Sequence, residues 1–183
     1  GSESVSGQKH RSEPILVEYA RSFFPVLLLV LVLRSFLFEP FRIPSGSMMP
    51  TLVDGDFIFV SKFSYGLRLP VINTKIFDIG EPLRGDVVVF RLPSNPSINY
   101  IKRVVGLPGD VVVYESADKE LSINGEVVSL ELLGDYEGNP GIQLGREKLG
   151  DQEHDLLHMR SRFSPGGTYV VPEGHYFVMG DNR

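Results

Sequence analysis

The chain has 183 residues, of which 42% are hydrophobic and 22% charged, and its formal net charge is −5. This apolar content excludes a disordered chain, and the length fits one domain, or one domain with a membrane segment. An acidic chain without a dominant basic stretch is not expected to bind nucleic acid. Because cysteine is absent, disulfides, thiolate metal sites and a cysteine nucleophile are excluded.

The N-terminal part of the chain divides into a polar tail and an apolar run. We predict that residues 1–22 form a cytoplasmic tail, which starts with a Gly-Ser pair typical of a cloning scar. Residues 23–38 (FFPVLLLVLVLRSFLF) are predicted to form a transmembrane helix, lengthened by apolar residues upstream, because a bilayer core of ~30 Å needs about 20 helical residues. A buried core helix and a cleaved export signal are the alternatives. FEPFRIP follows the run instead of an A-x-A pattern, which argues against the export signal.

Basic residues on the N-terminal side of the apolar run predict the orientation of the chain. Lys9, Arg11 and Arg21 favour a cytoplasmic location for the tail. Residues 39–183 are then expected on the extracytoplasmic (periplasmic) side of the inner membrane, in a chain that crosses the bilayer once as given. The lipid bilayer is therefore an expected partner.

From residue 39 onward the sequence changes to short β-rich runs separated by turn residues. Four runs are predicted as strands: Asp56–Phe63, Asp86–Leu92, Tyr100–Val105 and Val111–Tyr114. Two hairpins are also predicted, one over Leu121–Val128 with Asn124-Gly125 as its turn and one that pairs Tyr169–Val171 with Tyr176–Met179. The polar segment Glu131–Arg162 is predicted to be an excursion from the core. The expected architecture is a mainly β domain behind one N-terminal membrane helix.

The histidines and carboxylates are weak candidates for chemistry. His154 and His158 are four residues apart, but HDLLH lacks the glutamate of H-E-x-x-H and lies in a segment expected to be loop-like, so no metal site is predicted. His175 lies beside a turn and is predicted to be at the surface rather than in a Ser-His-Asp triad. Carboxylates such as Asp181 mostly follow glycine or lie in turns, where capping explains them. No cofactor is expected.

The segment FRIPSGSMMPTL, residues 41–52, is the strongest candidate for a catalytic element. Two prolines bracket two serines and a glycine, which indicates a rigid stretch that presents Ser45 and Ser47. A serine hydroxyl needs a base before it becomes a good nucleophile. Lys102 is a candidate base because it lies inside the apolar run YIKRVV, where burial of an ammonium lowers its pKa. A solvated lysine on an edge strand is the alternative.

Four motifs, in order, resemble those of bacterial type I signal peptidases (leader peptidases), which are membrane-bound serine proteases with a Ser–Lys dyad. PSGSMMPTL at residues 44–52 resembles the nucleophile motif of that family, and RGDVVVF at residues 84–90 its central strand. YIKRVVGLPGD at residues 100–110 resembles its lysine motif, and GDNR at residues 180–183 the start of its last motif. The resemblance covers the chain from about Phe23 to its end, with residues 115–168 as a variable insertion in a β-sheet or barrel-like catalytic domain.

The resemblance implies a serine endopeptidase that removes N-terminal signal peptides from exported preproteins after A-x-A-like sites. Ser47 would be the nucleophile and uncharged Lys102 the general base. The Ser45 hydroxyl and the Ser47 backbone N–H would form the oxyanion hole, in which each donor contributes roughly 3–4 kcal/mol. Arg103 and Asp181 resemble a supporting ion pair of the family.

The resemblance also implies apolar pockets that admit only small substrate side chains. The residue one position before the cut would lie against Ile43, Met48, Leu52 and Tyr100. The residue three positions before the cut would lie against Phe41, Ile58, Val89 and Ile101, of which Ile58 and Val89 are equally explained by core packing. The preprotein would add as a strand along a sheet edge near residues 84–90.

The last motif of the family continues into a segment with another serine that contacts the lysine, whereas this sequence ends at Arg183. A C-terminally truncated chain is therefore expected, and the missing segment bears on the position of Lys102. Two other functions are alternatives. A self-cleaving Ser–Lys domain, like those of SOS-response repressors, is disfavoured by the membrane helix. A non-catalytic, membrane-tethered preprotein-binding domain is disfavoured because binding requires none of Ser45, Ser47 and Lys102.

Overall fold

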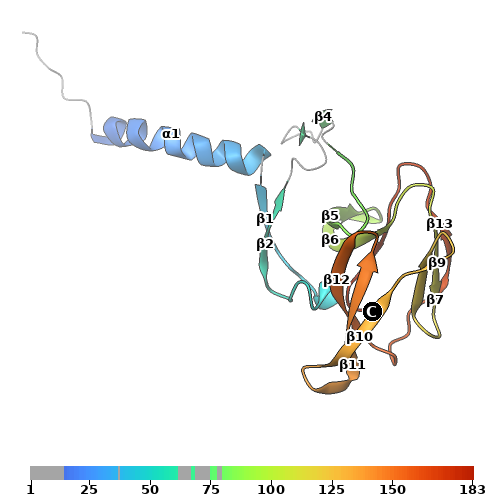
Figure 1. The fold of residues 1–183 in the computed structure, drawn as a ribbon. Coiled ribbons are helices and arrows are strands. Elements are labelled where there is room, and N and C mark those ends of the chain that lie inside the picture. The colour runs from blue at the N-terminus through green and yellow to red at the C-terminus, as the bar shows by residue number, and fades with distance from the viewer. Residues whose placement is uncertain (1–14, 37, 62–66, 69–74, 78–79) are drawn as a thin grey trace, which may run out of the picture.

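A long N-terminal helix precedes a domain of short antiparallel strands (Figure 1). The computed structural model describes residues 15–36, 38–61, 67–68, 75–77 and 80–183. Most of the predicted cytoplasmic tail, with Lys9 and Arg11, lies outside the described residues, as do the last two residues of the strand predicted over Asp56–Phe63. The fold within the described ranges is mainly β, as predicted.

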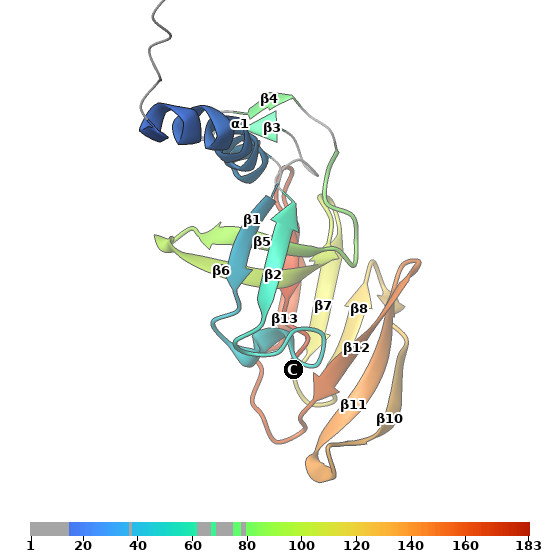
Figure 2. The same ribbon diagram turned by 90° about the vertical axis from the view of Figure 1, so that its left-hand side faces the viewer.

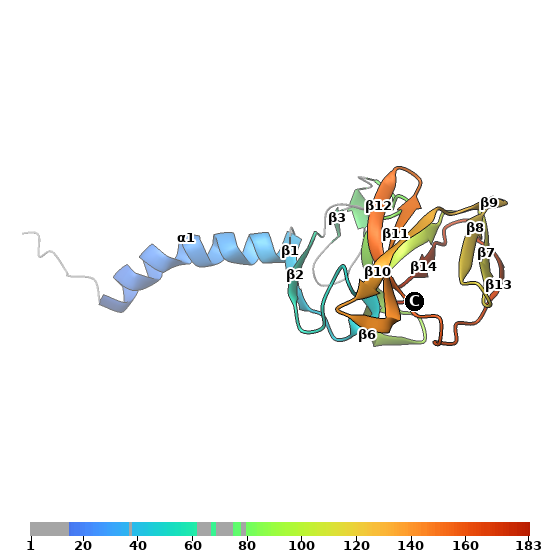
Figure 3. The same ribbon diagram turned by 60° about the horizontal axis from the view of Figure 1, so that its bottom comes forward.

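Helix α1 (Ile15–Phe36) extends away from the β domain (Figures 1 and 3). It begins eight residues before the predicted start, and strand β1 begins already at Phe38. The large apolar side chains from Phe23 to Leu33 are 40–65% exposed. No helix among the described residues is long and apolar enough to cross a membrane, which differs from the transmembrane helix predicted over residues 23–38. Charged side chains lie on both sides of the apolar run of α1: Glu18 and Arg21 precede it and Arg34 follows most of it.

The strands of the described residues form five antiparallel sheets. Two are hairpins, formed by β1 (Phe38–Arg42) with β2 (Phe57–Ser61) and by β3 (Leu67–Arg68) with β4 (Lys75–Phe77). A third sheet has the order β14 (Phe177–Met179), β6 (Asn95–Gly106), β5 (Val87–Leu92). A fourth has the order β13 (Gly167–Val170), β7 (Val111–Glu115), β8 (Glu120–Ile123), β9 (Glu126–Val127). The fifth has the order β10 (Leu130–Tyr136), β11 (Asn139–Leu149), β12 (Gln152–His158).

The core lies where three of these sheets meet, on the side of the domain away from α1 (Figures 2 and 3). Its buried side chains come from β6, β7, β8 and β11 and from the segment after β13: Val105, Val112, Tyr114, Leu121, Ile123, Leu149 and Val171. Strand β6 changes character along its length, since residues 95–100 are exposed and residues 103–106 are buried. The buried half anchors the strand in the core, and Lys102 lies where exposure gives way to burial.

The strands predicted over Asp86–Leu92 and Val111–Tyr114 and the hairpin over Leu121–Val128 are confirmed. The turn of that hairpin has φ of 54° at Asn124 and 84° at Gly125. This left-handed backbone is the conformation that an Asn-Gly pair tolerates best. The strand predicted over Tyr100–Val105 is longer, because it begins at Asn95, and β1 was not predicted.

Two predictions of strand arrangement are wrong. Residues 169–171 and 176–179 do not pair with each other, because β13 pairs with β7 and β14 pairs with β6. Residues 131–162 are not an excursion, since they contain most of the three-stranded sheet β10-β11-β12 with Leu149, Leu156 and Leu157 buried. The sequence of this segment is polar even at buried positions, which include Glu147 and His154.

The burial of Leu149 at 1% exposure gives a test of this corrected fold. Leu149→Ala is expected to reduce the free energy of unfolding by about 2–5 kcal/mol, because it removes transfer energy and leaves a cavity in the core. Leu132→Ala is the matched control in the same sheet, since Leu132 is 41% exposed and its truncation should change stability little. Urea denaturation followed by circular dichroism measures both. Equal small losses would show that β11 does not contribute to the core.

Candidate active site

The segment 45–48, which we call the serine turn, forms a short turn anchored by one buried side chain. Ser45 has extended backbone, with φ −161° and ψ 151°, and is followed by a single 3₁₀ turn over Gly46–Met48. The Met49 N–H donates to the Gly46 carbonyl at 3.2 Å, which closes the turn. Met48 is completely buried, whereas Ser47 is partly exposed. The turn therefore fixes its own backbone through Met48 and leaves the Ser47 hydroxyl accessible.

The Lys102 amine lies against this hydroxyl, with Nζ 2.5 Å from Ser47 Oγ. Lys102 comes from β6, where it is opposite Val88 of β5, and its Nζ lies 5.6 Å from the centre of the Tyr100 ring. Burial lowers the pKa of Lys102; nearby Asp181 raises it and Arg162 lowers it, and the resulting pKa is below the ordinary lysine value. The amine is thus biased toward the uncharged form that accepts a proton.

The second serine of the segment lies beside the first. The Ser45 hydroxyl donates to Ser47 Oγ at 3.4 Å, so both hydroxyls and the Lys102 amine are close together. The three residues singled out from the sequence as catalytic candidates are brought into one place, although Lys102 is 55 residues from Ser47 along the chain.

A buried ion pair joins the lysine strand to the C-terminal segment. Arg103 Nε lies 2.9 Å from Asp181 Oδ1 and Arg103 Nη2 lies 2.7 Å from Asp181 Oδ2. The Thr51 hydroxyl donates to Asp181 Oδ2 at 2.6 Å, and Arg103 Nη1 donates to the Gly85 carbonyl at 2.7 Å. Arg103 is 5% exposed and Asp181 is fully buried. The predicted pairing of Arg103 with Asp181 is present.

Residues 180–182 also hold the serine turn directly. The Asn182 N–H donates to the Ser47 carbonyl at 3.2 Å, and Asn182 Nδ2 donates to the Gly46 carbonyl at 2.9 Å. A Cβ on Gly180 would collide with the Ser47 carbonyl oxygen and would lie 3.8 Å from Lys102 Nζ. Sequence reasoning did not assign roles to Gly180, Asn182 or Thr51, although the GDNR motif was the signal that contained the first two.

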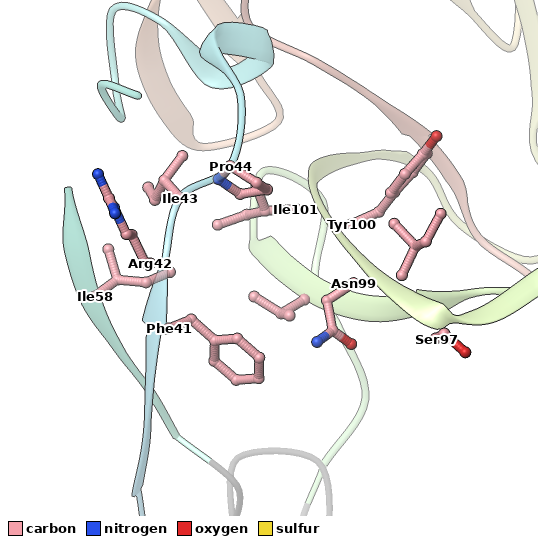
Figure 4. Close-up of a pocket in the computed structure, with 11 residues that line it drawn as sticks. Phe41, Arg42, Ile43, Pro44, Ile58, Ser97, Asn99, Tyr100 and Ile101 are labelled. Carbon is pink, nitrogen blue, oxygen red and sulfur yellow. The ribbon is translucent and has the colours of Figure 1, made fainter. Parts of the chain in front are cut away.

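An apolar cavity of about 310 Å³ lies beside this site, between the β1–β2 hairpin and β6 (Figure 4). The lining side chains come from β1, β2, β5, β6 and the segment after β1, and Figure 4 labels nine of them. Six predicted substrate-binding residues line it: Phe41, Ile43, Ile58, Val89, Tyr100 and Ile101. The other two, Met48 and Leu52, are not among the lining residues, and Met48 is completely buried. These six residues, which the sequence analysis divides between two pockets, line one cavity.

No hydrogen bond or ion pair among the described residues joins His154, His158 or His175 to Ser47 or Lys102. His154 and His158 are buried in β12, so the expectation of a loop-like location was wrong. No group of three His, Asp, Glu or Cys side chains among the described residues could hold a metal ion. His175 is exposed, as predicted, and its Nδ1 lies 2.9 Å from the Glu173 carbonyl oxygen.

The electrostatics of Lys102 give a direct prediction. Arg162→Gln is expected to raise the pKa of Lys102, because the Arg162 charge disfavours a second positive charge nearby. Arg160→Gln is the matched control, since Arg160 is similarly exposed but does not contribute to the pKa shift of Lys102. NMR titration of ¹³C-labelled lysine side chains measures the pKa. A Lys102 pKa that is the same in both variants and the parent would contradict this account of its electrostatics.

Comparison with known proteins identifies the family. A family model described as "Signal peptidase, peptidase S26" matches residues 16–183. The chain is 61% identical over 184 residues to signal peptidase I of Pseudomonas fluorescens, covering 99% of this chain and 64% of that protein. It is 59% identical over 179 residues to signal peptidase I of Pseudomonas aeruginosa, covering 96% of this chain and 63% of that protein. Signal peptidase I of Haemophilus influenzae is 34% identical over 227 residues, covering 96% of this chain and 65% of that protein.

The chain thus spans less than two thirds of the length of these relatives. The family match covers both the serine turn and the lysine strand, whose side chains meet in the structure. By this match, the chain belongs to the signal peptidase family, peptidase S26.

Proposed function

We propose that this chain carries the catalytic site of a serine endopeptidase that removes N-terminal signal peptides from exported preproteins. The observation that carries the proposal is the 2.5 Å contact between Ser47 Oγ and Lys102 Nζ, because it pairs a nucleophile with a base of lowered pKa. The names of the similar proteins, all signal peptidase I, support the reaction class.

In the proposed acylation step, the uncharged Lys102 amine takes the Ser47 proton while Ser47 Oγ attacks the scissile carbonyl carbon. The resulting ammonium gives its proton to the leaving amine as the C–N bond breaks, which leaves an acyl-enzyme on Ser47. Lys102 then removes a proton from a water molecule that attacks the ester carbonyl, and the resulting ammonium returns a proton to Ser47 Oγ as the ester C–O bond breaks. The cycle returns Lys102 to its uncharged form, so one residue acts as base and acid in turn.

The oxyanion of each tetrahedral intermediate needs hydrogen-bond donors. We assign this role to the Ser45 hydroxyl and the Ser47 backbone N–H. The position of Ser45 supports the assignment, because its hydroxyl lies 3.4 Å from the Ser47 hydroxyl and is exposed. A donor in such a site contributes roughly 3–4 kcal/mol to transition-state stabilisation.

The cavity beside Ser47 is the proposed binding site for the residues before the cut. Its apolar walls and volume of about 310 Å³ favour small side chains, which fits substrates with A-x-A-like sites. Ile43 and Tyr100 are assigned to the first residue before the cut, and Phe41, Ile58, Val89 and Ile101 to the third. Strand β5 is an edge strand among the described strands, so it offers backbone groups to an extended preprotein.

The exposed apolar side chains of α1 support a location at the inner membrane, with the β domain on the periplasmic side. We predict that the chain floats with phospholipid vesicles in a density gradient. Leu28→Lys together with Leu31→Lys is expected to reduce flotation, because each lysine is costly to place in lipid. Glu131→Lys together with Glu153→Lys in the β domain controls for the added charge. Recovery of the unmodified chain in the dense fractions would contradict the membrane location.

Neither alternative function has a specific observation in its favour. A binding domain has no need for a Ser–Lys contact with a lowered lysine pKa. A self-cleaving domain needs a segment of its own chain at the serine, whereas the hydrogen bonds of the Ser47 hydroxyl among the described residues are with the Ser45 hydroxyl and the Lys102 amine.

Cleavage of a preprotein with an A-x-A site, carried out in detergent and followed by product mass, tests the proposal. The unmodified chain should release a signal peptide cut after that site, and Ser47→Ala and Lys102→Ala should abolish cleavage. Ser45→Ala should lower turnover by about 10²–10³-fold. Activity should rise with pH through the pKa of Lys102, and since that pKa is lowered, the rise should precede the usual range of lysine.

Ser61→Ala and Lys148→Ala are matched controls outside the site and should leave turnover unchanged. Turnover that survives Lys102→Ala would contradict the Ser–Lys mechanism. An absence of cleavage by the unmodified chain at any pH would contradict the assignment of this catalytic activity to the chain.

A further inference from the structure

A second buried ion pair lies behind the serine turn, in the sheet that sequence analysis had placed outside the core. Arg183 Nη1 lies 2.7 Å from Glu147 Oε1, and Arg183 Nη2 lies 2.8 Å from Glu147 Oε2. Glu147 of β11 is 2% exposed and Arg183 is 8% exposed. Burial raises the pKa of Glu147, whereas Arg183 and His154 lower it. Their combined effect exceeds that of burial, so the pKa of Glu147 is below the ordinary glutamate value. The carboxylate is therefore ionised and forms a two-pronged contact with the guanidinium.

The C-terminal segment that carries Arg183 lies against β12, where Asn182 forms an isolated parallel β-bridge with Leu157. Arg183 Nε donates to the Gly180 carbonyl at 3.0 Å, so the side chain that binds Glu147 also closes the turn over residues 180–183. The Arg183 N–H donates to the Leu157 carbonyl at 2.8 Å, and the Leu157 N–H donates to the Asp181 carbonyl at 2.8 Å. Glu147 thus acts on a segment whose path is already set along β12.

The same segment makes the contacts that hold Ser47. The Asn182 N–H binds the Ser47 carbonyl, Asn182 Nδ2 binds the Gly46 carbonyl, and Gly180 packs directly against the Ser47 carbonyl. Asn182 is adjacent to Arg183 in the chain, and two residues separate Gly180 from Arg183. A displacement of Arg183 therefore moves the support of the nucleophile.

His154 links the two buried ion pairs. Its Nε2 lies 3.3 Å from Glu147 Oε2 and 3.7 Å from Asp181 Oδ1, and its side chain is 5% exposed. Asp181 in turn binds Arg103, which follows Lys102 in β6. A continuous set of buried charged and polar groups therefore runs from Glu147 to the strand that carries the lysine.

We propose that Glu147 is a positioning residue for the Ser47–Lys102 pair, acting through Arg183 and the segment 180–182. This proposal rests on the proposed peptidase function and assigns a role in it to the sheet β10-β11-β12. Glu147 touches neither Ser47 nor Lys102, so its effect passes through the backbone contacts of Asn182 and Gly180. Loss of its charge leaves Arg183 buried without an anion, which favours a new path for the segment.

Glu147→Gln tests the proposal, because the amide keeps the size of the side chain and removes its charge. We expect kcat for preprotein cleavage to fall by about 10²-fold with KM unchanged, since misplacement of a reacting group by about 1 Å has this effect. Glu153→Gln is the matched control in the same sheet, because Glu153 is exposed, and it should leave kcat and KM unchanged.

A second readout does not depend on cleavage. A Cβ on Gly180 would lie 3.8 Å from Lys102 Nζ, so the segment lies close to that amine. Displacement of the segment should reduce the burial of the amine, which is the largest influence on its pKa and exceeds the opposing effect of Asp181, and should therefore raise the pKa of Lys102. NMR titration of ¹³C-labelled lysine should show this rise in Glu147→Gln and not in Glu153→Gln. A merely structural role would lower the melting temperature without moving the Lys102 pKa.

A folded Glu147→Gln with unchanged kcat and an unchanged Lys102 pKa would overturn the proposal. If the unmodified chain does not cleave preprotein, the peptidase function fails, whereas a raised Lys102 pKa in Glu147→Gln still supports positioning. If Glu147→Gln does not fold, Glu147→Asp takes its place, because it keeps the charge and only withdraws the carboxylate from Arg183. Its Lys102 pKa then decides between the same two outcomes.

Discussion

The buried ion pair between Arg103 and Asp181 is the interaction on which the geometry of the site depends. Arg103 follows Lys102 in β6, and Asp181 precedes Asn182, which holds the Ser47 carbonyl. The pair therefore sets the distance between the strand that carries the amine and the segment that supports the hydroxyl. Burial of the two charges costs desolvation free energy. The two hydrogen bonds between Arg103 and Asp181, together with the hydrogen bond from the Thr51 hydroxyl to Asp181, offset this cost. Removal of one partner would leave the other charge buried and alone, so the site tolerates neither loss.

The position of Lys102 along β6 suits the role of general base that we propose for it. A lysine that acts as a base must be desolvated to lose its charge, and its amine must also be accessible. β6 is exposed up to residue 100 and buried from residue 103, and Lys102 is half-buried at the boundary. Asp181 raises the pKa of Lys102, but burial is the larger effect and lowers it. The Asp181 carboxylate forms its ion pair with the Arg103 guanidinium, so its main role is to hold the fold together and not to bind the Lys102 amine.

Several sequence predictions failed because partner choice is not a local property. Residues 169–171 and 176–179 flank a turn and were expected to pair with each other. Instead they belong to different sheets, because β13 pairs with β7 and β14 pairs with β6. Residues 131–162 were expected to leave the core because they are polar. In the fold, Glu147 and His154 of that segment are buried beside charged partners from a distant part of the chain. The polar character of the segment therefore did not mean that it is exposed.

The sequence by itself determined the local elements: the serine turn between prolines, the apolar strand that contains Lys102, and the Asn124-Gly125 hairpin. Each depends on φ restriction, alternation or positive φ within a few neighbouring residues. The candidate catalytic residues were assigned from the order of the motifs and not from any local signal of contact. Only the tertiary structure decided that Ser47 and Lys102, 55 residues apart, lie 2.5 Å from each other. It also decided that Asn182 binds the Ser47 carbonyl and that Asp181 pairs with Arg103, the neighbour of Lys102. The physical reason is that buried charges must find partners, and those partners become neighbours only when the chain has folded.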